Sequence, residues 1–457
     1  MCPRIRKFNC LIYTISDLIR EEQDPIDKIS RRRFFESGLR LAGLAGLGGP
    51  WLKGLASPRA MPNTPAGPSP RPGPAAGRGG FFGVQTHFGQ YRAGVDELLD
   101  QIKAAGASWI RDEVYWSEIE KKKGVFDFPP QYDHYLKAAQ IRGIQVLLIL
   151  DFGNALYSGA DKGGPATEAE RIAFARYCGA VVTRYGPFGV RHFEVWNEPN
   201  ASMFWKPQPN PGDYAKLLEA AYKACKAADP GSTVLGCSTS GTDLDFIGGV
   251  LAAGGGRFMD AVSFHPYCQP SPPEERLLND ISRLKALAPK KSLWITEIGY
   301  PTHAGAAGVH EEAQADYLVR TFLLARSSPA VQRVFWYDFQ NDGDDRAEAE
   351  FNFGLVRMER TPKPAYRALK TMASLVVDLS PAELRTSGDT YLLTFEGGKN
   401  RLTAVWRSGG TDSIKVPCSS GVYRVIERDG ESRTVEAKGS FIEISASEKP
   451  RYIVLQN

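Results

Sequence analysis

Hydrophobic and polar positions follow a repeating pattern from residue 81 to about residue 376. Short apolar runs with strand-like composition alternate with longer segments in which apolar residues recur at helical spacing. Eight runs of the first kind are expected to be strands: 81–88, 108–114, 144–152, 190–198, 233–240, 261–267, 292–300 and 331–339. Eight amphipathic segments are expected to be helices: 95–105, 131–142, 167–185, 213–228, 243–253, 274–288, 311–327 and 363–376.

Strands that alternate with crossover helices imply a parallel sheet. Eight such units within residues 81–376 match the size of a closed (β/α)₈ barrel, the TIM barrel. A doubly wound open sheet is the alternative. The barrel is favoured because polar residues suited to chemistry follow most of the strands and do not gather at one switch point. In a barrel these strand ends open on one face, so residues distant in sequence converge there.

The helical pattern stops after about residue 375, and short runs of alternating polar and apolar residues follow. Such runs are typical of strands that have one buried face. We expect residues 377–457 to form a small antiparallel β-sandwich. Its strand candidates are 391–398, 401–408, 413–418, 421–430, 441–446 and 451–457.

The N-terminal region resembles a twin-arginine export leader. Three arginines at 31–33 precede a weakly apolar stretch rich in Gly and Ala, which extends to about residue 56. An amphipathic helix of the folded domain is the alternative, and the glycine content disfavours it. Arg40 and Lys53 interrupt the apolar stretch, which is too short to span a bilayer. The sequence thus predicts an export signal at 1–60, a periplasmic or extracellular location by the twin-arginine route, and no membrane span in the mature chain.

Composition adds few constraints. Residues 61–80 are so rich in Pro, Gly and Ala that a disordered linker is expected. Residues 1–60 hold 11 Lys and Arg against 6 Asp and Glu, which leaves 45 basic and 46 acidic residues in the rest of the chain. That balance gives no reason to expect a nucleic-acid partner. The cysteines beyond the leader have no metal-binding spacing and are expected to be mostly buried thiols: Cys178, Cys225, Cys237, Cys268 and Cys418.

Two glutamates end the fourth and seventh expected strands, Glu198 and Glu297. A single Glu at a strand end is most often an ordinary surface carboxylate. Two that face one pocket are what glycosidic-bond cleavage requires, because one carboxyl protonates the leaving oxygen while the other attacks the sugar carbon. Asn197 precedes Glu198 and can hydrogen-bond a sugar hydroxyl, and nearby tryptophans offer surfaces for sugar rings. These neighbours favour the catalytic interpretation.

Residues 81–376 resemble clan A of the glycoside hydrolases, and within it family 39 and its relatives. The clan has an Asn-Glu pair at the end of strand four and a Glu at the end of strand seven, as Asn197-Glu198 and Glu297 are placed here. Residues 108–128 are similar to the second-strand segment of the family. The resemblance implies a retaining enzyme that cleaves an oligo- or polysaccharide, with Glu297 as nucleophile, Glu198 as acid/base and no cofactor.

The resemblance also suggests supporting roles around the pair. Arg111 would keep Glu297 ionised, although an ordinary ion pair with Asp112 or Glu113 is equally compatible with the sequence. His265 and Tyr267, after the sixth strand, would bring a donor to the nucleophile. Since the two glutamates must differ in protonation, Glu198 is expected to be the more desolvated and Glu297 the better supplied with donors.

Further substrate contacts are expected at the other strand ends, although each of these residues could instead be core or a loop cap. Trp336 is the expected platform beneath the reacting sugar. The candidates for sugar hydroxyls are His87, Asp151 and Asn154. The candidates for outer-subsite surfaces are Trp116 and Trp205.

One segment partly resembles a calcium loop, at 338–343. The bidentate Glu expected at its twelfth position is Ala349, so a solvated loop is favoured and no metal is expected. Two other functions remain open at this point. One is a non-catalytic carbohydrate-binding protein on the same fold. The other is a secreted scaffold protein, which would lack a pocket between the two glutamates.

Overall fold

The computed structural model describes residues 80–90, 93–158 and 163–455. The export signal expected at 1–60, and the linker expected at 61–80 except for Gly80, lie outside the described residues. No helix among the described residues combines the length and apolarity needed to cross a membrane.

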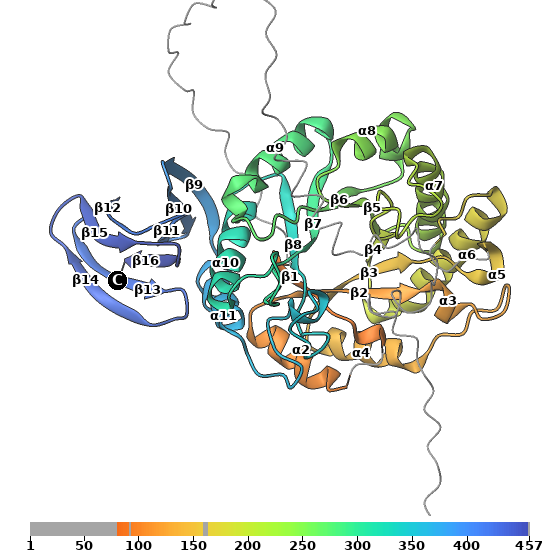
Figure 1. Ribbon diagram of the computed structural model, residues 1–457, viewed down its shortest axis with the longest axis horizontal. Coiled ribbons are helices and arrows are strands. Elements are labelled where there is room, and N and C mark those ends of the chain that lie inside the picture. The colour runs from red at the N-terminus through yellow and green to blue at the C-terminus, as the bar shows by residue number, and fades with distance from the viewer. Residues whose placement is uncertain (1–79, 91–92, 159–162, 456–457) are drawn as a thin grey trace, which may run out of the picture. The chain divides into compact units, whose positions relative to one another are not determined.

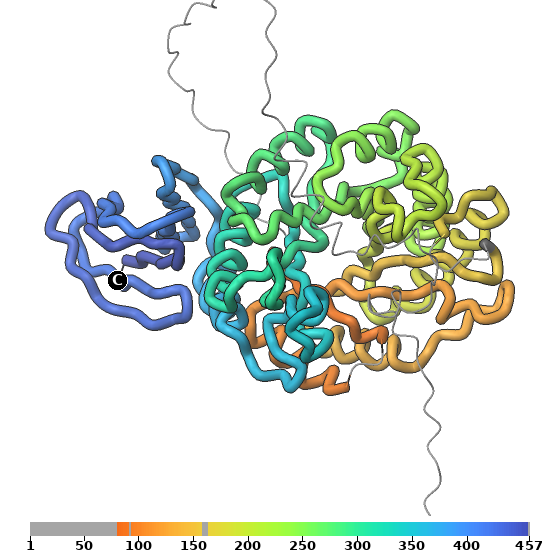
Figure 2. The backbone as a smooth tube through the Cα atoms, in the orientation of Figure 1, coloured from red at the N-terminus to blue at the C-terminus, as the bar shows by residue number. Residues whose placement is uncertain are grey.

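Eight parallel strands form a closed barrel in the order of the sequence, so the predicted (β/α)₈ fold is confirmed (Figure 1). The chain passes once around the barrel, from orange at β1 to cyan at β8 in Figure 2. The strands are β1 (Phe82–Gln85), β2 (Trp109–Tyr115), β3 (Gln145–Asp151), β4 (His192–Val195), β5 (Thr233–Ser240), β6 (Ala261–His265), β7 (Ser292–Ile298) and β8 (Val331–Trp336).

Helices follow the strands where the amphipathic pattern predicts them. The long ones are α2 (Val95–Ala104), α4 (Pro130–Ile141), α6 (Glu168–Tyr185), α7 (Pro211–Ala228), α8 (Leu244–Ala252), α9 (Leu277–Leu287), α10 (Glu311–Ser327) and α11 (Pro364–Val376). Short additions are α3 (Trp116–Ile119), α5 (Ala155–Ser158), η2 (Phe88–Gln90), η3 (Gly186–Phe188), η4 (Gly255–Arg257), η5 (Pro273–Glu275) and η6 (Glu350–Asn352). Side-chain caps fix several starts, because Thr167, Asn210 and Asp243 accept hydrogen bonds from backbone amides in the first turns of α6, α7 and α8.

Apolar side chains from different strands pack together inside the barrel. Gly83 on β1 makes room for one of them, since a Cβ there would lie 2.5 Å from the ring of Phe335. A second, larger core lies outside the strands, against the helices. The interior cluster consists of Trp109, Leu147, Leu235, Ala261, Trp294 and Phe335.

One titratable side chain, His192, packs against this interior cluster. The His192 ring packs edge-on against Trp109, with ring centroids 4.6 Å apart, and Arg333 lies over both Trp109 and Trp294. Burial, together with the nearby charge of Arg333, lowers the pKa of His192 from 6.5 to about 4. The folded protein therefore holds this ring neutral in weak acid, where an unfolded chain would protonate it.

Acid is expected to destabilise the fold through His192. Its contribution to stability is complete above about pH 6.5 and is lost as the pH falls towards 4, by up to about 3 kcal/mol. His192→Phe removes the titrating group and should flatten this part of the pH dependence, whereas His134→Asn, at a side chain that is 58% exposed, should not. Denaturant unfolding at pH 7.5 and pH 4.5 measures the difference, and equal losses in the parent and His192→Phe would contradict the assignment.

The C-terminal segment forms two antiparallel sheets that pack as a small sandwich. The larger sheet has the order β14-β13-β16-β11-β10-β9, and the smaller one pairs β12 with β15. Two of these strands were not predicted, β9 and β14, because both lie at edges and are mostly polar and exposed. The strands are β9 (Ser380–Ser387), β10 (Thr390–Gly397), β11 (Asn400–Arg407), β12 (Asp412–Pro417), β13 (Gly421–Glu427), β14 (Ser432–Ala437), β15 (Phe441–Ala446) and β16 (Arg451–Leu455).

Hydrogen bonds join the sandwich to the barrel. The indole Nε1 of Trp406, on β11, donates to Glu274 Oε1 at 2.7 Å, and the same carboxylate pairs with the buried Arg320 of α10. Arg428 binds Asp316 on α10 at 2.6 Å. Trp406 is fully buried, so it is part of this junction and offers no surface for a glycan.

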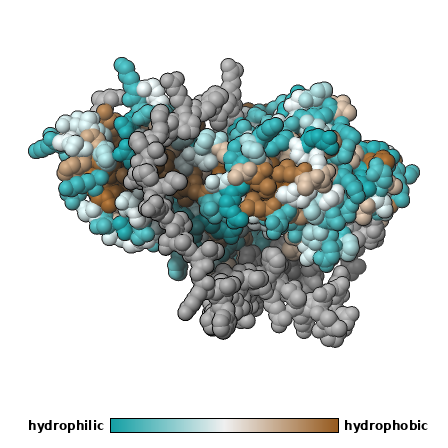
Figure 3. Space-filling model, turned by 90° about the horizontal axis from the view of Figure 1, so that it is seen from above, coloured by the Kyte–Doolittle hydropathy of each residue, from teal (hydrophilic) through white to brown (hydrophobic). Residues whose placement is uncertain are grey.

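Hydrophobic side chains are largely withdrawn into these cores. On the face drawn in Figure 3, hydrophilic residues cover most of the described surface and hydrophobic ones form separate patches. The exposed large hydrophobic residues come from different elements, which is ordinary for a folded domain. They are Val125, Ile141, Ile172, Leu287, Val377, Val422, Phe441 and Leu455.

Candidate active site

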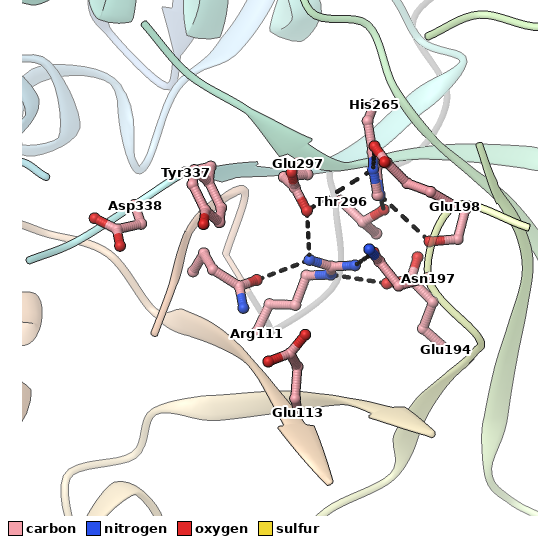
Figure 4. Close-up of polar contacts among 12 residues, drawn as sticks. Arg111, Glu113, Glu194, Asn197, Glu198, His265, Thr296, Glu297, Tyr337 and Asp338 are labelled. Carbon is pink, nitrogen blue, oxygen red and sulfur yellow. Dashed lines mark hydrogen bonds and ion pairs between the residues drawn. The ribbon is translucent and has the colours of Figure 1, made fainter. Parts of the chain in front are cut away.

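Arg111, the third residue of β2, connects four strands of the barrel through its guanidinium (Figure 4). Its Nε donates to Glu194 on β4 at 2.8 Å, and its Nη2 donates to Asn197 Oδ1 at 2.9 Å. Its Nη1 donates to Gln85 on β1 at 2.8 Å and to Glu297 on β7 at 3.0 Å. The guanidinium is buried, so these contacts fix it in one position.

Burial and the neighbouring carboxylates have opposite effects on the pKa of Arg111. Burial opposes its charge, but Glu194 and Glu297 outweigh that cost and raise its pKa. Burial likewise disfavours ionisation of Glu194, and the charge of Arg111 overcomes it and lowers the pKa of Glu194. The alternative partners from the sequence are not used, because Asp112 accepts from the loop after β1 and Glu113 accepts from Gln90 and Tyr115.

Glu297 receives one donor on each carboxylate oxygen. Arg111 Nη1 lies 3.0 Å from Oε2, and the hydroxyl of Tyr267 donates to Oε1 at 2.7 Å. These two hydrogen bonds hold the carboxylate in one orientation, as a nucleophile at this position requires. The expected placement of Arg111 and Tyr267 beside Glu297 is therefore observed.

Glu198 follows β4 in a left-handed backbone conformation, with φ of 47°. Its amide donates to Ser238 O at 2.9 Å, and its Oε1 lies 3.0 Å from Nδ1 of His265. The other ring nitrogen of His265 contacts the hydroxyls of Ser238 and Thr296, at 3.3 and 3.2 Å. The imidazole is fully buried, and its contacts on both nitrogens hold it against Glu198.

His265 lies beside both glutamates, with its Nδ1 3.0 Å from Glu198 Oε1 and 3.8 Å from Glu297 Oε2 (Figure 4). Oxygens of Glu198 and Glu297 and a ring nitrogen of His265 all lie within 4.8 Å of one another. Each glutamate side chain is 13% exposed, so the expected difference in desolvation is absent. What differs is the neighbouring charge, because the Arg111 guanidinium contacts Glu297 and not Glu198. The expectation that Glu297 has more hydrogen-bond donors is confirmed, and the expectation that Glu198 is more buried is wrong.

Two further side chains border the pair. Asn197 Oδ1 is occupied by Arg111, which turns the amide nitrogen of Asn197 away from the guanidinium and leaves it able to donate to a ligand. Tyr337 lies beside Glu297 in Figure 4, and its hydroxyl donates to Glu350 at 3.2 Å. Its ring packs against His87, the residue expected to contact sugar at the end of the first strand, with centroids 5.9 Å apart.

The assignment of Trp336 as a sugar platform is wrong. Side chains alternate along β8, so Phe335 points into the barrel and Trp336 points outward to the helices. Trp336 is 0% exposed and stacks against Tyr300 and Phe322. The aromatic residue on the site's side of this strand end is the next one, Tyr337.

Three other expected contacts also belong to the core. Trp116 is buried between Tyr157 and Tyr177, with its Nε1 hydrogen-bonded to Glu120, so it offers no outer-subsite surface. Trp205 is buried against Trp196 and Tyr214. Asn154 is buried and caps local backbone, donating to the carbonyls of Trp116 and Glu120. Loop aromatics and amides stabilise the loops here instead of facing a ligand.

Asp151 is also withdrawn from the mouth, so a direct sugar contact is contradicted. The side chain is 0% exposed, and neither carboxylate oxygen has a hydrogen-bond partner among the described residues. Burial, followed by repulsion from Glu113, raises the pKa of Asp151 well above its ordinary range. Both effects disfavour the charged form of this acid.

Two groups of described residues bring metal-ligand atoms within 4.8 Å of one another. One is the set of Glu198, His265 and Glu297. The other joins His87 to Asp338 and Asp342, whose oxygens lie 3.4 and 3.6 Å from His87 Nε2. This second group could accept a cation, and it contains two acids of the segment that partly resembles a calcium loop. Carboxylates and histidines also gather in this way without any metal.

Some residues of the site were not predicted from the sequence. Glu194 holds Arg111, and its only signal was a charged residue inside the apolar run of β4. Gln85, Ser238 and Thr296 are small or neutral polar residues at strand ends. Nothing in their local sequence separates them from ordinary loop caps.

The family comparison agrees with the barrel fold. A family model described as "Cellulase (glycosyl hydrolase family 5)" matches residues 73–331, which is more than half of the chain. A curated beta-xylosidase of Geobacillus stearothermophilus is 31% identical over 216 residues, which cover 41% of this chain and 42% of the relative. The chain thus aligns with less than half the length of that relative.

Solved structures give longer alignments. A family 39 glycoside hydrolase from the gut symbiont Bacteroides cellulosilyticus WH2 is 29% identical, with a TM-score of 0.73 over 82% of this chain and 80% of that one. A monomeric beta-xylosidase from Caulobacter crescentus CB15 is 17% identical, with a TM-score of 0.62 over 83% of this chain and 96% of that one. The second likeness shows a shared fold.

Proposed function

We propose that this chain is a retaining O-glycoside hydrolase. The premise is its family, since the chain belongs to the cellulase family (glycosyl hydrolase family 5) of the clan A glycoside hydrolases and is related to family 39. Glu297 is the nucleophile and Glu198 is the acid/base. The observation that carries this proposal is the placement of the two carboxylates at one mouth, with oxygens within 4.8 Å. Retaining enzymes hold the two groups about 5–5.5 Å apart, and inverting enzymes leave more room for a water molecule.

The first half of the reaction transfers the sugar to the enzyme. Glu297 attacks the anomeric carbon, and the bond from that carbon to the leaving oxygen breaks as Glu198 gives this oxygen a proton. Arg111 and Tyr267 hold Glu297 in its orientation until it attacks. Asn197 donates to the hydroxyl beside the reacting carbon, a contact that strengthens in the transition state.

The second half releases the sugar. Glu198, now a carboxylate, takes a proton from water as the water oxygen bonds to the anomeric carbon and the ester to Glu297 breaks. His265 holds Glu198 throughout, because its buried ring is fixed by Ser238 and Thr296. Two inversions at one carbon return the original configuration.

The product anomer tests this proposal. Proton NMR during hydrolysis of an aryl β-glycoside, or of an oligosaccharide, should show the β-anomer first and the α-anomer only after mutarotation. An α-anomer as first product would mean inversion. Binding of glycans by the parent protein with no turnover of any substrate would favour a non-catalytic carbohydrate-binding protein.

The substrate is proposed to be an oligo- or polysaccharide, and aryl β-xylosides are the first probes. The aligned relatives support this choice, since one is a beta-xylosidase and another is a family 39 enzyme. Reducing-end release from xylan and other polysaccharides would separate cleavage within a chain from cleavage at its end.

Export by the twin-arginine route is proposed from the sequence alone, on the arginines at 31–33 and the Gly-rich stretch behind them. Replacing Arg31 and Arg32 together by lysine should leave the protein inside the cell that makes it. Cell fractionation with an activity assay or immunoblot measures this. Export of the lysine variant at the parental level would contradict the route.

A further inference from the structure

Strand β5 has an irregular backbone next to the acid/base. Cys237 and Ser238 have φ of 82° and 44°, and the pairing of β5 with β6 shifts register between Cys237 and Thr239. Such left-handed conformations are unfavourable for residues other than glycine, and they persist when surrounding contacts hold them. We call Cys237 and Ser238 the β5 bulge.

Two buried hydroxyls hold the β5 bulge. The amide of Cys237 donates to the hydroxyl of Tyr214 at 2.9 Å, and the amide of Ser238 donates to Ser263 Oγ at 3.1 Å. Tyr214 lies on α7, is fully buried, and donates its own proton to Val195 O on β4 at 2.9 Å. Its hydroxyl therefore ties the bulge to the last residue of β4.

The bulge contacts Glu198 by two routes. Ser238 O accepts from the Glu198 amide at 2.9 Å, which fixes the backbone of the glutamate. Ser238 Oγ contacts Nε2 of His265 at 3.3 Å, and Nδ1 of His265 lies 3.0 Å from the Glu198 carboxylate. Val195, the other partner of the Tyr214 hydroxyl, comes three residues before Glu198. A shift of the bulge would therefore move both the backbone and the side chain of Glu198.

We infer that Tyr214 is a positioning residue for the acid/base: through the β5 bulge, its hydroxyl places the Glu198 carboxyl where it can protonate the leaving oxygen. This inference rests on the proposed function. Tyr214 is fully buried, and its hydroxyl contacts Val195 and Cys237 and not Glu297, which has its own donors, Arg111 and Tyr267. Loss of the hydroxyl should thus impair proton transfer and spare nucleophilic attack.

The dependence of kcat/KM on the leaving group distinguishes impaired proton transfer from impaired nucleophilic attack. The constant kcat/KM reports only the glycosylation step, in which a poor leaving group needs the acid and a dinitrophenolate does not. Tyr214→Phe should lower kcat/KM roughly tenfold or more for a phenyl glycoside, and less than about twofold for the 2,4-dinitrophenyl glycoside of the same sugar. The slope of log kcat/KM against the pKa of the leaving phenol should steepen.

A matched variant separates positioning from general loss of packing. Tyr177 is equally buried, and its hydroxyl donates to the backbone carbonyl of Val114 on β2. Tyr177→Phe should lower the melting temperature without changing the slope. If Tyr214→Phe folds poorly, Ser263→Ala removes the other anchor of the bulge and should steepen the slope in the same way.

The outcomes distinguish this inference from the proposed function. Equal losses on both aryl glycosides in Tyr214→Phe, or a slope equal to that of the parent, would overturn the positioning role while the enzyme stays a glycosidase. A parent protein that hydrolyses none of these glycosides would instead overturn the proposed function. A steeper slope in Tyr214→Phe but not in Tyr177→Phe supports the inference.

Discussion

Replacing Glu297 by glutamine is expected to lower kcat by on the order of 10⁴-fold or more, because an amide cannot form the glycosyl ester. Glutamine keeps an oxygen that can accept from Arg111, so the fold and its melting temperature should change little. Steady-state kinetics on an aryl glycoside, with circular dichroism of the same sample, measures both quantities.

Glu113 provides the matched control. Its carboxylate is also labelled in Figure 4, but it is hydrogen-bonded to Gln90 and Tyr115 and not to either glutamate of the pair. Glu113→Gln should retain turnover within about tenfold of the parent. If Glu113→Gln were as inactive as Glu297→Gln, or if Glu297→Gln kept most of its activity, the nucleophile would be misassigned.

Replacing Arg111 by methionine is expected to cost about 3–5 kcal/mol in the free energy of unfolding, since it leaves the buried Glu194 without its counter-charge. The same change should lower kcat strongly, because Glu297 and Asn197 both lose a donor. Denaturant unfolding and kinetics on one preparation measure the two effects. Adding Glu194→Gln should restore part of the stability and little of the activity.

Arg320 offers a comparison outside the mouth. It forms a buried ion pair with Glu274, at 2.6 Å, and has no described contact with Glu198 or Glu297. Arg320→Met should lose a similar amount of stability and keep kcat near the parental value at a temperature where it is folded. If Arg111→Met were as stable as the parent, the guanidinium would not be the counter-charge that the buried Glu194 needs.

The barrel was predictable because its signal is repeated. Each strand is a short apolar run followed by an amphipathic helix, so eight weak signals support one fold. Glu198 and Glu297 were found by the same logic, since a carboxyl at the end of a barrel strand must emerge at the mouth. The two unpredicted edge strands, β9 and β14, lack the apolar face on which that logic depends.

The aromatic contacts were harder because residue type does not say which way a side chain points. Trp336 and Tyr337 are neighbours, and only the observed orientation of Phe335 into the barrel shows that Trp336 faces the helices. Trp116 and Trp205 follow strands at the mouth, yet both are buried by loop and helix residues distant in sequence. Whether such a tryptophan is buried depends on residues distant in the sequence, so the local pattern does not predict it.

The support of the glutamates was also beyond the sequence. Arg111 had two acidic neighbours in the chain, but its partners come from β1, β4 and β7. Asp151 was expected to face a sugar and is instead fully buried. Such networks are set by how the barrel closes, because closure brings together residues of strands that are distant in the sequence.

Covalent trapping tests the central claim most directly. A 2,4-dinitrophenyl 2-deoxy-2-fluoro-β-glycoside of the sugar that the protein hydrolyses should inactivate it with release of one phenolate per chain. Peptide mass spectrometry should then find the fluoroglycosyl mass on Glu297. Attachment to another residue, or turnover with no trapped intermediate and an inverted product, would contradict the assignment of Glu297 as nucleophile and Glu198 as acid/base.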